Sequence, residues 1–504
     1  EDRPALYQRI LEKVRAGRFV PVGGTYVEMD CNLPSGESLA RQFLYGQRFF
    51  QSEFGAKASE FWLPDTFGYA PQLPQLMRQA GISRFLSQKL SWNLTNKFPY
   101  TTFYWEGLDG STVLAHFPPN DNYNSSADVE ECLKAVAQQR APAAPQALLL
   151  YGHGDGGGGP APSHLEQLAR LGAGRDTAGP LESAGFPRVR HCRSPAAFFE
   201  RLEASLSAAD DGAGGAAAAE APRWVGELYL ELHQGTFTSQ ARHKFLNRRC
   251  EEALKSMELY MTMAYCIVGA GKLPALRNVQ DQLDSNWKAV LLNQFHDILP
   301  GSSIQQVHEE ANAAFEEVLK FCRAKIFSFR QLISVHFISA GKDPEKGGGE
   351  SVTVDILDKN MIVWNCLGFD RENEIVELDS EELLLALTKD SNDGSTADFL
   401  LQRTEIRNYV SHSSGEEAAL PSQARGGLLL ASAPSMGCSF VKPQLLPRGA
   451  AAQVQPCSAP PGATAGSDRG DGFRLSNGLV CATLDSGGRL VSFVDYRDRT
   501  GGLL

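Results

Sequence analysis

Residues 61–69 read Phe-Trp-Leu-Pro-Asp-Thr-Phe-Gly-Tyr, and this stretch decides our interpretation of the fold. A short apolar run followed by a proline and a glycine predicts the end of a buried strand and a turn. Asp65 lies among four aromatic side chains, which exclude water and offer a flat face to a ring-shaped ligand. A carboxylate in such a place is suited to act as a nucleophile, a general base or a metal ligand. A Pro-Asp turn taken alone more often carries a surface carboxylate, so other motifs are needed to choose.

The composition is that of a globular protein. The chain has 504 residues, of which 42% are hydrophobic and 21% charged, and a chain of this length forms about two to four domains. The net charge of -11 argues against nucleic acid or an anionic membrane as a partner, because an acidic surface attracts neither. A neutral polyhydroxylated substrate is compatible with this charge. No apolar run approaches the roughly 20 residues that span a bilayer, and no signal peptide is visible.

The ten cysteines occur singly, without a CxxC pair, which favours free thiols in a reducing compartment. Two tripeptides, at residues 93–95 and 124–126, fit the glycosylation sequon and favour secretion instead. Such tripeptides are common by chance, so we give the cysteine pattern more weight.

The N-terminal part of the chain alternates predicted helices and strands. Amphipathic spacing predicts helices at residues 4–16, 37–54 and 73–80. Apolar runs predict strands at residues 19–22, 85–86, 113–117 and 147–151. This order is typical of a parallel α/β domain, in which functional side chains collect after the carboxyl ends of the strands. We expect four polar residues at that edge of the sheet: Asp30, Asp65, Lys89 and Asn93.

A glycine-rich loop follows the last of these predicted strands. It reads Gly-His-Gly-Asp-Gly-Gly-Gly-Gly-Pro over residues 152–160. Four consecutive glycines lose much conformational entropy on folding, so we expect a ligand to approach this backbone closely. A phosphate-binding loop is the competing interpretation, but no Gly-Lys-Ser/Thr follows. We favour a carboxylate, Asp155, that the loop holds open to a substrate.

Changes in composition divide the chain into domains. Residues 207–222 are of low complexity and predict a linker after a catalytic domain over residues 1–206. Three amphipathic helices then predict a helical bundle over residues 223–340. Residues 341–504 contain short alternating segments and hairpin turns, which predict the start of an all-β region, a β-sandwich that is cut short.

Two stretches around the predicted bundle carry more polar groups than packing requires. Residues 226–239 alternate apolar and polar side chains and contain Glu231 and His233. Residues 293–297 read Asn-Gln-Phe-His-Asp and precede a Pro-Gly turn. A histidine near a helix end usually complements the helix dipole. Because Asp297 is adjacent to His296, a metal site is the alternative.

Two carboxylates on separate loops, a histidine and several aromatic residues are typical of glycoside hydrolysis. A retaining enzyme holds its two carboxyl groups about 5 Å apart, and an inverting enzyme holds them farther apart. The sequence leaves the distance between Asp65 and Asp155 open.

The chain resembles the cytosolic class of α-mannosidases in glycoside hydrolase family 38. Six blocks in the family's order carry the resemblance: residues 23–30 (Gly-Gly-Thr-Tyr-Val-Glu-Met-Asp), 62–69, 88–93, 154–160, 226–239 and 293–297. The resemblance implies a retaining α-mannosidase that removes terminal α-D-mannosyl residues from free oligosaccharides and N-glycans by a metal-assisted double displacement. Together with the cysteine pattern it implies a cytoplasmic protein, with a lysosomal location as the alternative.

The resemblance also implies roles for particular residues. Asp65 matches the nucleophile, which is also a ligand of a zinc ion, with cobalt as the alternative metal, and His296 matches a second ligand. Asp155 matches the general acid/base. The implied substrate-binding residues are Phe67, Lys89, Trp92, Asn93 and Asp297.

The metal site departs from the family's pattern. The other two family ligands come from a His-x-Asp motif on the first strand, and no such motif precedes Asp65 here. We therefore expect the first strand to be absent and the affinity for zinc to be low. The alternative functions are a metal-dependent deacetylase or amidase and a catalytically inert, truncated glycan-binding product. The expected partner is a mannose-containing oligosaccharide, without nucleic acid or membrane, and the oligomeric state is left open.

Overall fold

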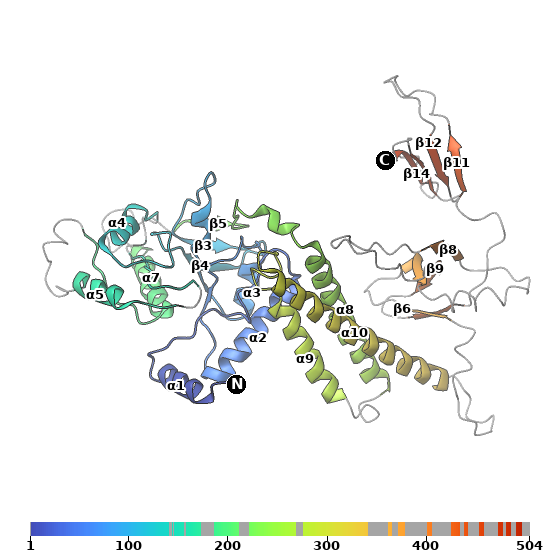
Figure 1. Ribbon diagram of the computed structural model, residues 1–504, viewed down its shortest axis with the longest axis horizontal. Coiled ribbons are helices and arrows are strands. Elements are labelled where there is room, and N and C mark those ends of the chain that lie inside the picture. Colours follow the sequence, from blue (N-terminus) through green and yellow to red (C-terminus); the bar gives the residue numbers. More distant parts are fainter. Residues whose placement is uncertain are drawn as a thin grey trace, which may run out of the picture. The chain divides into compact units, whose positions relative to one another are not determined.

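A computed structural model gives the structure of this chain (Figure 1). It describes residues 2–140, 144, 146–155, 158–172, 186–210, 221–268 and 276–340, together with nine strands beyond residue 340. The chain divides into two compact units, residues 1–342 and 343–504, and each is described by itself.

A five-stranded sheet forms the centre of the first unit. Its strands lie in the order β1 (Glu60–Trp62), β2 (Arg84–Leu86), β4 (Thr112–His116), β3 (Thr102–Glu106) and β5 (Arg223–Val225). All neighbouring strands are parallel except β3 and β4. Those two are antiparallel because a short hairpin joins them, and Gly110 supplies the positive φ of +82° that its turn requires. The sheet is therefore mixed: it fits the predicted α/β domain, and all of its strand pairs except β3 with β4 are parallel as predicted.

Two of the predicted strands are wrong. Residues 19–22 form no strand, and the side chains of Phe19 and Val20 are 50% and 39% exposed. This segment meets the sheet only at its end, where the Trp62 N–H donates to the carbonyl of Gly23 at 3.1 Å. Residues 147–151 form only an isolated bridge between Tyr151 and Ser125. Both apolar runs lack a neighbouring strand to complete their hydrogen bonds.

Helices cover both faces of the sheet. The three predicted N-terminal helices are present as α1 (Pro4–Arg15), α2 (Gly36–Phe54) and α3 (Leu73–Gln79). The remaining helices around the sheet are α4 (Val129–Ala137), α5 (Pro162–Leu171) and α7 (Pro195–Asp210). Figure 1 shows α4, α5 and α7 gathered to one side of the sheet and α2 and α3 to the other.

The two faces of the sheet are both apolar, since successive strand residues alternate between them. In β2, Phe85 packs into the core beneath α2, with Leu39 and Phe43, whereas Leu86 packs against α7. Helix α2 is capped at its start by Ser35, whose hydroxyl accepts a hydrogen bond from the Ser38 N–H, and at its end by the left-handed Gly55. A sheet buried on both faces exposes functional groups only at its strand ends.

Three long helices follow β5: α8 (Ala241–Val268), α9 (Leu276–Leu292) and α10 (Gln305–Ala340). Each of them contacts the other two. Trp287 is fully buried, donates to Glu258 at 2.9 Å, and lies 4.1 Å from the Arg41 guanidinium of α2. That these helices form a separate bundle domain stays a prediction. None of the helices in the described ranges is long and apolar enough to cross a membrane.

The predicted linker is only partly described. Helix α7 extends into it as far as Asp210, and β5, which follows it, pairs with β3 of the sheet. Residues 211–220 lie outside the described residues. The domain boundaries at residues 206 and 223 stay predictions.

The second unit contains antiparallel strands. They are β6 (Met361–Trp364), β7 (Arg371–Leu378), β8 (Leu401–Glu405), β9 (Arg425–Ala433), β10 (Cys438–Val441), β11 (Gln453–Cys457), β12 (Gly472–Ser476), β13 (Val480–Leu484) and β14 (Leu490–Asp495). They form three sheets, in the orders β10-β6, β7-β9-β8 and β11-β12-β13-β14. The predicted β-sandwich stays a prediction.

Gly46, on the buried face of α2, allows a close approach of helix and loop. A Cβ atom at this position would lie 2.3 Å from the carbonyl carbon of Thr25 and 2.6 Å from its Cα. Alanine normally stabilises a helix relative to glycine by about 1 kcal/mol. We nevertheless expect Gly46→Ala to lower the free energy of unfolding by about 1–3 kcal/mol, because the overlap is with backbone atoms. Urea unfolding measures this change.

Gly36 in the first turn of the same helix provides the matched control. A Cβ atom there meets nothing within 4 Å. Gly36→Ala is expected to leave the free energy of unfolding unchanged or to raise it slightly. A gain in stability for Gly46→Ala would contradict the close contact with Thr25.

Candidate active site

Asp65 and Lys89 follow neighbouring parallel strands, β1 and β2, and meet at the same edge of the sheet. The Lys89 ammonium donates to Oδ1 of Asp65 at 2.6 Å. The turn that carries Asp65 is fixed by Gln88, whose side-chain amide donates to the carbonyl of Pro64 at 2.6 Å. Tyr69 completes the turn, since its hydroxyl donates to the carbonyl of Leu63 at 2.8 Å. Asp65 therefore has a fixed position.

Aromatic rings surround the Lys89 ammonium. It lies 3.9 Å from the ring centre of Trp92 and 5.2 Å from that of Phe67, and the whole side chain is only 2% exposed. Ring faces attract a cation through their quadrupole. Lys89 belongs to a short 3₁₀ helix, Lys89–Trp92, which places the ammonium and the Trp92 ring on one side. The rings and Asp65 together satisfy this buried charge.

His296 reaches Asp65 from a distant part of the chain. Its backbone N–H donates to the carbonyl of Glu28 at 3.1 Å, and Asp30 N–H donates to the carbonyl of Gln294 at 2.8 Å. The imidazole Nδ1 also lies 2.9 Å from the Glu28 carbonyl, which can only accept. With Nδ1–H donated to that carbonyl, the Nε2 side of the ring faces Asp65, whose Oδ2 is 3.6 Å away.

The charges of this pair reinforce each other. Burial raises the pKa of Asp65, but His296 and Lys89 outweigh it and hold the pKa below its usual value. Burial lowers the pKa of His296, but Asp65 and the Glu28 carbonyl outweigh it and raise the pKa above its usual value. Asp65 is thus an ionised carboxylate, which a nucleophile or a metal ligand must be.

The described residues do not by themselves complete a metal site. Nε2 of His296 lies 3.6 Å from Asp65 and 3.7 Å from Oδ2 of Asp297, so donor atoms do converge there. However, the ammonium of Lys89 occupies the other oxygen of Asp65. Within the described ranges, no group of three or more His, Cys, Asp or Glu side chains is arranged to hold a metal ion. Four-coordinate zinc needs more than the two predicted ligands.

Asp155 lines the same cavity as Asp65. The cavity has a volume of about 1480 Å³, and Asp65, Asp155, His296 and Asp297 all line it. Asp155 is exposed, and its loop is held by Asn124, whose side-chain oxygen accepts from the N–H groups of Gly154 at 2.6 Å and of Asp155 at 3.2 Å. The structure therefore brings four of the predicted site residues to one cavity.

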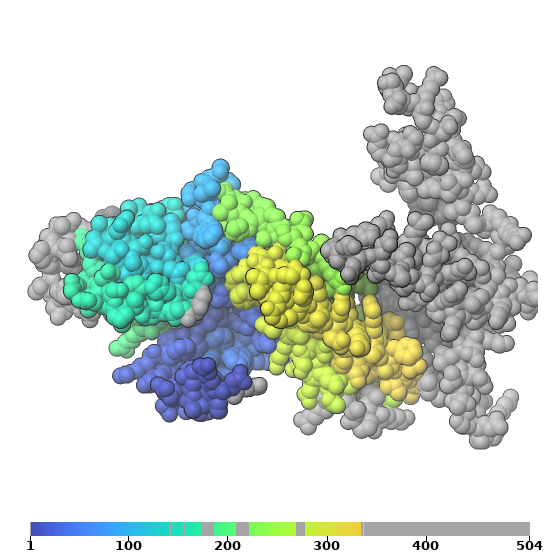
Figure 2. Space-filling model, in the orientation of Figure 1, coloured from blue at the N-terminus to red at the C-terminus, as the bar shows by residue number. Residues whose placement is uncertain are grey.

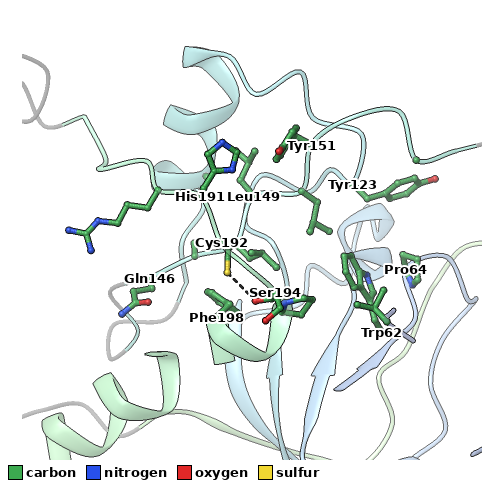
Figure 3. A pocket seen from close by; sticks show the side chains of 18 of the residues that line it. Trp62, Pro64, Tyr123, Gln146, Leu149, Tyr151, His191, Cys192, Ser194 and Phe198 are labelled. Atoms are coloured by element: carbon green, nitrogen blue, oxygen red, sulfur yellow. Dashed lines mark hydrogen bonds between the residues drawn. The ribbon is translucent and has the colours of Figure 1, made fainter. Parts of the chain in front are cut away.

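Tyr123 lies among the carboxylates of this cavity. Burial raises the pKa of its phenol, and the negative charges of Asp65, Asp155, Glu28 and Asp297 raise it further. Figure 3 shows Tyr123 on the same side of the cavity as Trp62 and Pro64. The Tyr123 hydroxyl is a hydrogen-bond donor in a part of the cavity that is rich in negative charge.

The other predicted site residues adjoin the cavity without lining it. The ring centre of Phe67 lies 5.0 Å from that of His233 and 6.2 Å from that of His296, and Trp92 lies 5.8 Å from His233. His233 has a φ of 62°, an uncommon conformation for a residue with a side chain, and it is exposed between the two rings. Phe67, Trp92 and His233 form an aromatic wall beside Asp65.

Asn93 has a positioning role in this structure. Its side-chain nitrogen donates to the carbonyls of Asn96 at 3.1 Å and Tyr229 at 2.9 Å, and its oxygen accepts from the N–H of Glu231 at 3.0 Å. Its side chain is buried and its polar atoms are occupied by backbone groups. Asn93 thus holds residues 229–231, which precede His233, against the loop after β2.

Two residues of the cavity had no assigned role in our sequence prediction. Glu28 belongs to a block that we recognised, but it was not assigned, and its carboxylate lies 3.9 Å from Nδ1 of His296. Tyr123 follows β4 in the segment Asp-Asn-Tyr-Asn at residues 121–124. The rule that found Asp65, that polar residues after a strand end face the site, also applies to Tyr123.

Two models of known protein families match this chain. Residues 1–227 match the glycosyl hydrolases family 38 N-terminal domain, and residues 231–331 match the alpha mannosidase middle domain. The chain therefore belongs to glycoside hydrolase family 38.

Its relatives are α-mannosidases. The chain is 49% identical over 324 residues to alpha-mannosidase G of Dictyostelium discoideum, covering 64% of this chain and 27% of that protein. It is 50% identical over 316 residues to alpha-mannosidase 2C1 of Homo sapiens (62% and 28% covered) and 41% identical over 330 residues to alpha-mannosidase of Saccharomyces cerevisiae (65% and 29% covered). The matched part of this chain thus spans less than a third of the length of these relatives.

The solved structures support the fold alone. The crystal structure of an alpha-mannosidase from Enterococcus faecalis V583 superposes with a TM-score of 0.60 at 18% sequence identity. The match covers 99% of this chain and 54% of that one.

Gln294 connects the His296 segment to the helices behind it. Its side-chain nitrogen donates to Asn247 at 2.9 Å and to Glu251 at 3.2 Å, and its oxygen accepts from Gln42 at 3.4 Å, all in the interior. We expect Gln294→Ala to lower the free energy of unfolding by about 2–3 kcal/mol, because it leaves buried polar groups without partners. Urea unfolding measures the loss.

Gln305→Ala is the control for this substitution. Gln305 is exposed at the start of α10, where its amide donates to Glu309 one turn along. Its replacement is expected to change the free energy of unfolding by less than about 0.5 kcal/mol. Equal effects of the two substitutions would show that the buried network does not stabilise the His296 segment.

Proposed function

We propose that this chain carries the catalytic residues of a retaining α-mannosidase, which hydrolyses terminal α-D-mannosyl residues of free oligosaccharides and N-glycans. One observation carries the proposal: Asp65, ionised between Lys89 and His296, shares a cavity with a second carboxylate, Asp155, on a glycine-rich loop. The names of the relatives supply the sugar. Neither a deacetylase nor an inert binding protein is favoured by any of these comparisons.

Each residue has a defined task in this proposal. The Asp65 carboxylate attacks the anomeric carbon and forms a glycosyl-enzyme ester, while Asp155 protonates the leaving oxygen. Asp155 then removes a proton from water, which attacks the same carbon and releases Asp65. Lys89 holds the nucleophile ionised and oriented before the attack. We assign the rings of Phe67 and Trp92 to the wall that flanks the sugar beside Asp65, and Asp297 to a hydrogen bond from a sugar hydroxyl.

The proposal includes a metal ion, zinc or cobalt, on the condition that further ligands are supplied. Asp65 and His296 would be two of its ligands, and groups other than the described residues must supply the rest. We also propose a cytoplasmic location. The cysteines of the described ranges support it, since Cys31, Cys132, Cys192, Cys250, Cys266 and Cys322 are all free thiols.

Hydrolysis of p-nitrophenyl α-mannoside tests the proposed function. It should be measured for this chain and for a version with a family His-x-Asp strand added before Glu1. In whichever form is active, Asp65→Asn is expected to lower kcat by a factor on the order of 10⁴, because it removes the nucleophile. Asp109→Asn, in the exposed turn between β3 and β4, is the control and should leave kcat unchanged.

Covalent trapping distinguishes the mechanisms. A 2-deoxy-2-fluoro mannosyl fluoride is expected to add one sugar mass to the peptide that contains Asp65. Turnover without such a label would rule out the retaining mechanism. If neither form hydrolyses the mannoside although both are folded, a glycan-binding role replaces the enzymatic one.

Metal content tests the ligand assignment separately. After dialysis against zinc, this chain alone is expected to retain well under one equivalent, because it offers two ligands, and the extended version about one. His296→Ala in the extended version should lower the zinc content, as measured by elemental analysis. Full zinc occupancy in the His296→Ala protein would exclude His296 as a ligand.

A further inference from the structure

His116 places a polar side chain in the apolar layer on one face of the sheet. It is the last residue of β4, the strand between β2 and β3, and it is fully buried. Its ring centre lies 4.7 Å from that of Phe198 of α7, which belongs to an apolar cluster with Leu86 and Leu114. Burial of a polar group is unfavourable unless the group is hydrogen-bonded. Packing alone would favour an apolar residue here, so the partners of the two ring nitrogens indicate the role of the histidine.

Both ring nitrogens of His116 have protein partners. The Leu148 N–H donates to Nε2 at 3.1 Å, so Nε2 carries no proton. The proton is therefore on Nδ1, which lies 2.9 Å from the Thr102 hydroxyl of β3. Burial lowers the pKa of His116 to about 3, so the ring is uncharged near neutral pH. Thr102 thus fixes the tautomer in which Nε2 accepts from Leu148.

The segment that His116 holds leads directly to Asp155. Residues 147–152 form no regular strand, and they are attached to the chain that follows β4. Ser125 exchanges two backbone hydrogen bonds with this segment, at 3.2 Å and 3.1 Å, and Asn124 accepts from the Asp155 N–H at 3.2 Å. Of these three successive attachments, that of His116 is the one made by a residue of the sheet.

The backbone of His116 supports the other carboxylate. Its carbonyl accepts from the Ser87 N–H at 3.4 Å, and the Ser87 hydroxyl accepts from the Lys89 N–H at 3.2 Å. Lys89 in turn donates to Asp65. In Figure 2 the described part of residues 120–172, coloured cyan to green, forms a lobe at the left of the first unit. His116 thus connects that lobe to the strand end that carries the nucleophile.

We propose that His116 is a positioning residue for Asp155, which sets the place of the acid/base loop relative to Asp65 by holding Leu148 at the end of β4. The proposal rests on the proposed function for the role of Asp155. A retaining mechanism requires a defined separation of its two carboxyl groups, about 5 Å. Leu148 and Asp155 line the cavity and His116 does not, so His116 acts through the segment that it holds.

Hydrogen exchange tests the attachment without requiring activity. In His116→Leu, the protected amides of residues 147–155 are expected to exchange at least about tenfold faster, because the loss of one such hydrogen bond shifts a local opening equilibrium by about that factor. His116→Gln keeps a hydrogen-bond acceptor at the end of the side chain and should restore slow exchange. Mass spectrometry of the peptides measures both, and circular dichroism confirms that the variants are folded.

Val113→Ala controls for a general loss of stability. Val113 is buried in the same strand but belongs to the core on the opposite face of the sheet. Its replacement should leave the exchange of residues 147–155 unchanged. Equal acceleration in Val113→Ala and His116→Leu would overturn the attachment.

Thr102→Val is the milder variant, for the case that His116→Leu does not fold. It removes the partner that holds the proton on Nδ1 of His116, and it should accelerate the exchange of residues 147–155 by a smaller factor. No acceleration in either variant would overturn the attachment.

Leaving-group dependence distinguishes positioning of Asp155 from a purely structural role. A general acid contributes most when the leaving group is poor. In an active form of the protein, His116→Leu should lower kcat/KM toward phenyl α-mannoside by at least about tenfold. It should change kcat/KM much less toward dinitrophenyl α-mannoside, whose leaving group departs without a proton, and His116→Gln should restore most of the loss.

Two outcomes separate this proposal from the proposed function. Equal losses of kcat/KM toward both mannosides in His116→Leu would overturn the positioning of Asp155. Faster exchange of residues 147–155 in a protein that hydrolyses no mannoside would support the attachment by His116 and count against the proposed function.

Discussion

The short backbone pairing between residues 28–30 and 294–296 is the constraint on which the site depends. Two segments separated by 268 residues exchange hydrogen bonds there, and the pairing fixes both the backbone and the ring of His296. Asp65, by contrast, is held by the sheet. The site is thus assembled from a strand end and a helix end, and this backbone pairing connects the two. Behind it, Gln294 and Glu251 fill the interior with satisfied polar groups instead of apolar ones, which fixes a single arrangement of the helices.

The electrostatics of the cavity follow from this assembly. A buried ammonium beside Asp65 keeps one carboxylate ionised, and the exposed loop of Asp155 leaves the other open to solvent. Two carboxylates in such different surroundings can take different roles in one reaction.

Local patterns allowed the prediction of helices α1 to α3 and of the position of Asp65, because amphipathic spacing and a strand end with a proline turn are short-range signals. The mixed sheet was missed, although Asp109-Gly110 between β3 and β4 is a recognisable hairpin turn. The apolar run at residues 19–22 resembled a strand, but whether a strand forms depends on a neighbour that the sequence does not identify. Asn93 was expected at the carboxyl edge of the sheet, and the family resemblance implied that it lines the pocket. Its position was inferred correctly from β2, but its partners at residues 229–231 are more than 130 residues away.

The order of the strands along the chain separates two parts of the site. The strands β3 and β5 are neighbours in the sheet, yet β5 comes only after the long excursion of residues 117–222 that follows β4. That excursion carries Tyr123 and Asp155, whereas Asp65, Lys89 and His296 lie outside it. The entropy cost of closing a long loop grows only slowly with its length, so insertions here cost the sheet little. The segment that carries Asp155 can therefore vary as a separate module, while the strand ends that carry Asp65 and Lys89 are kept.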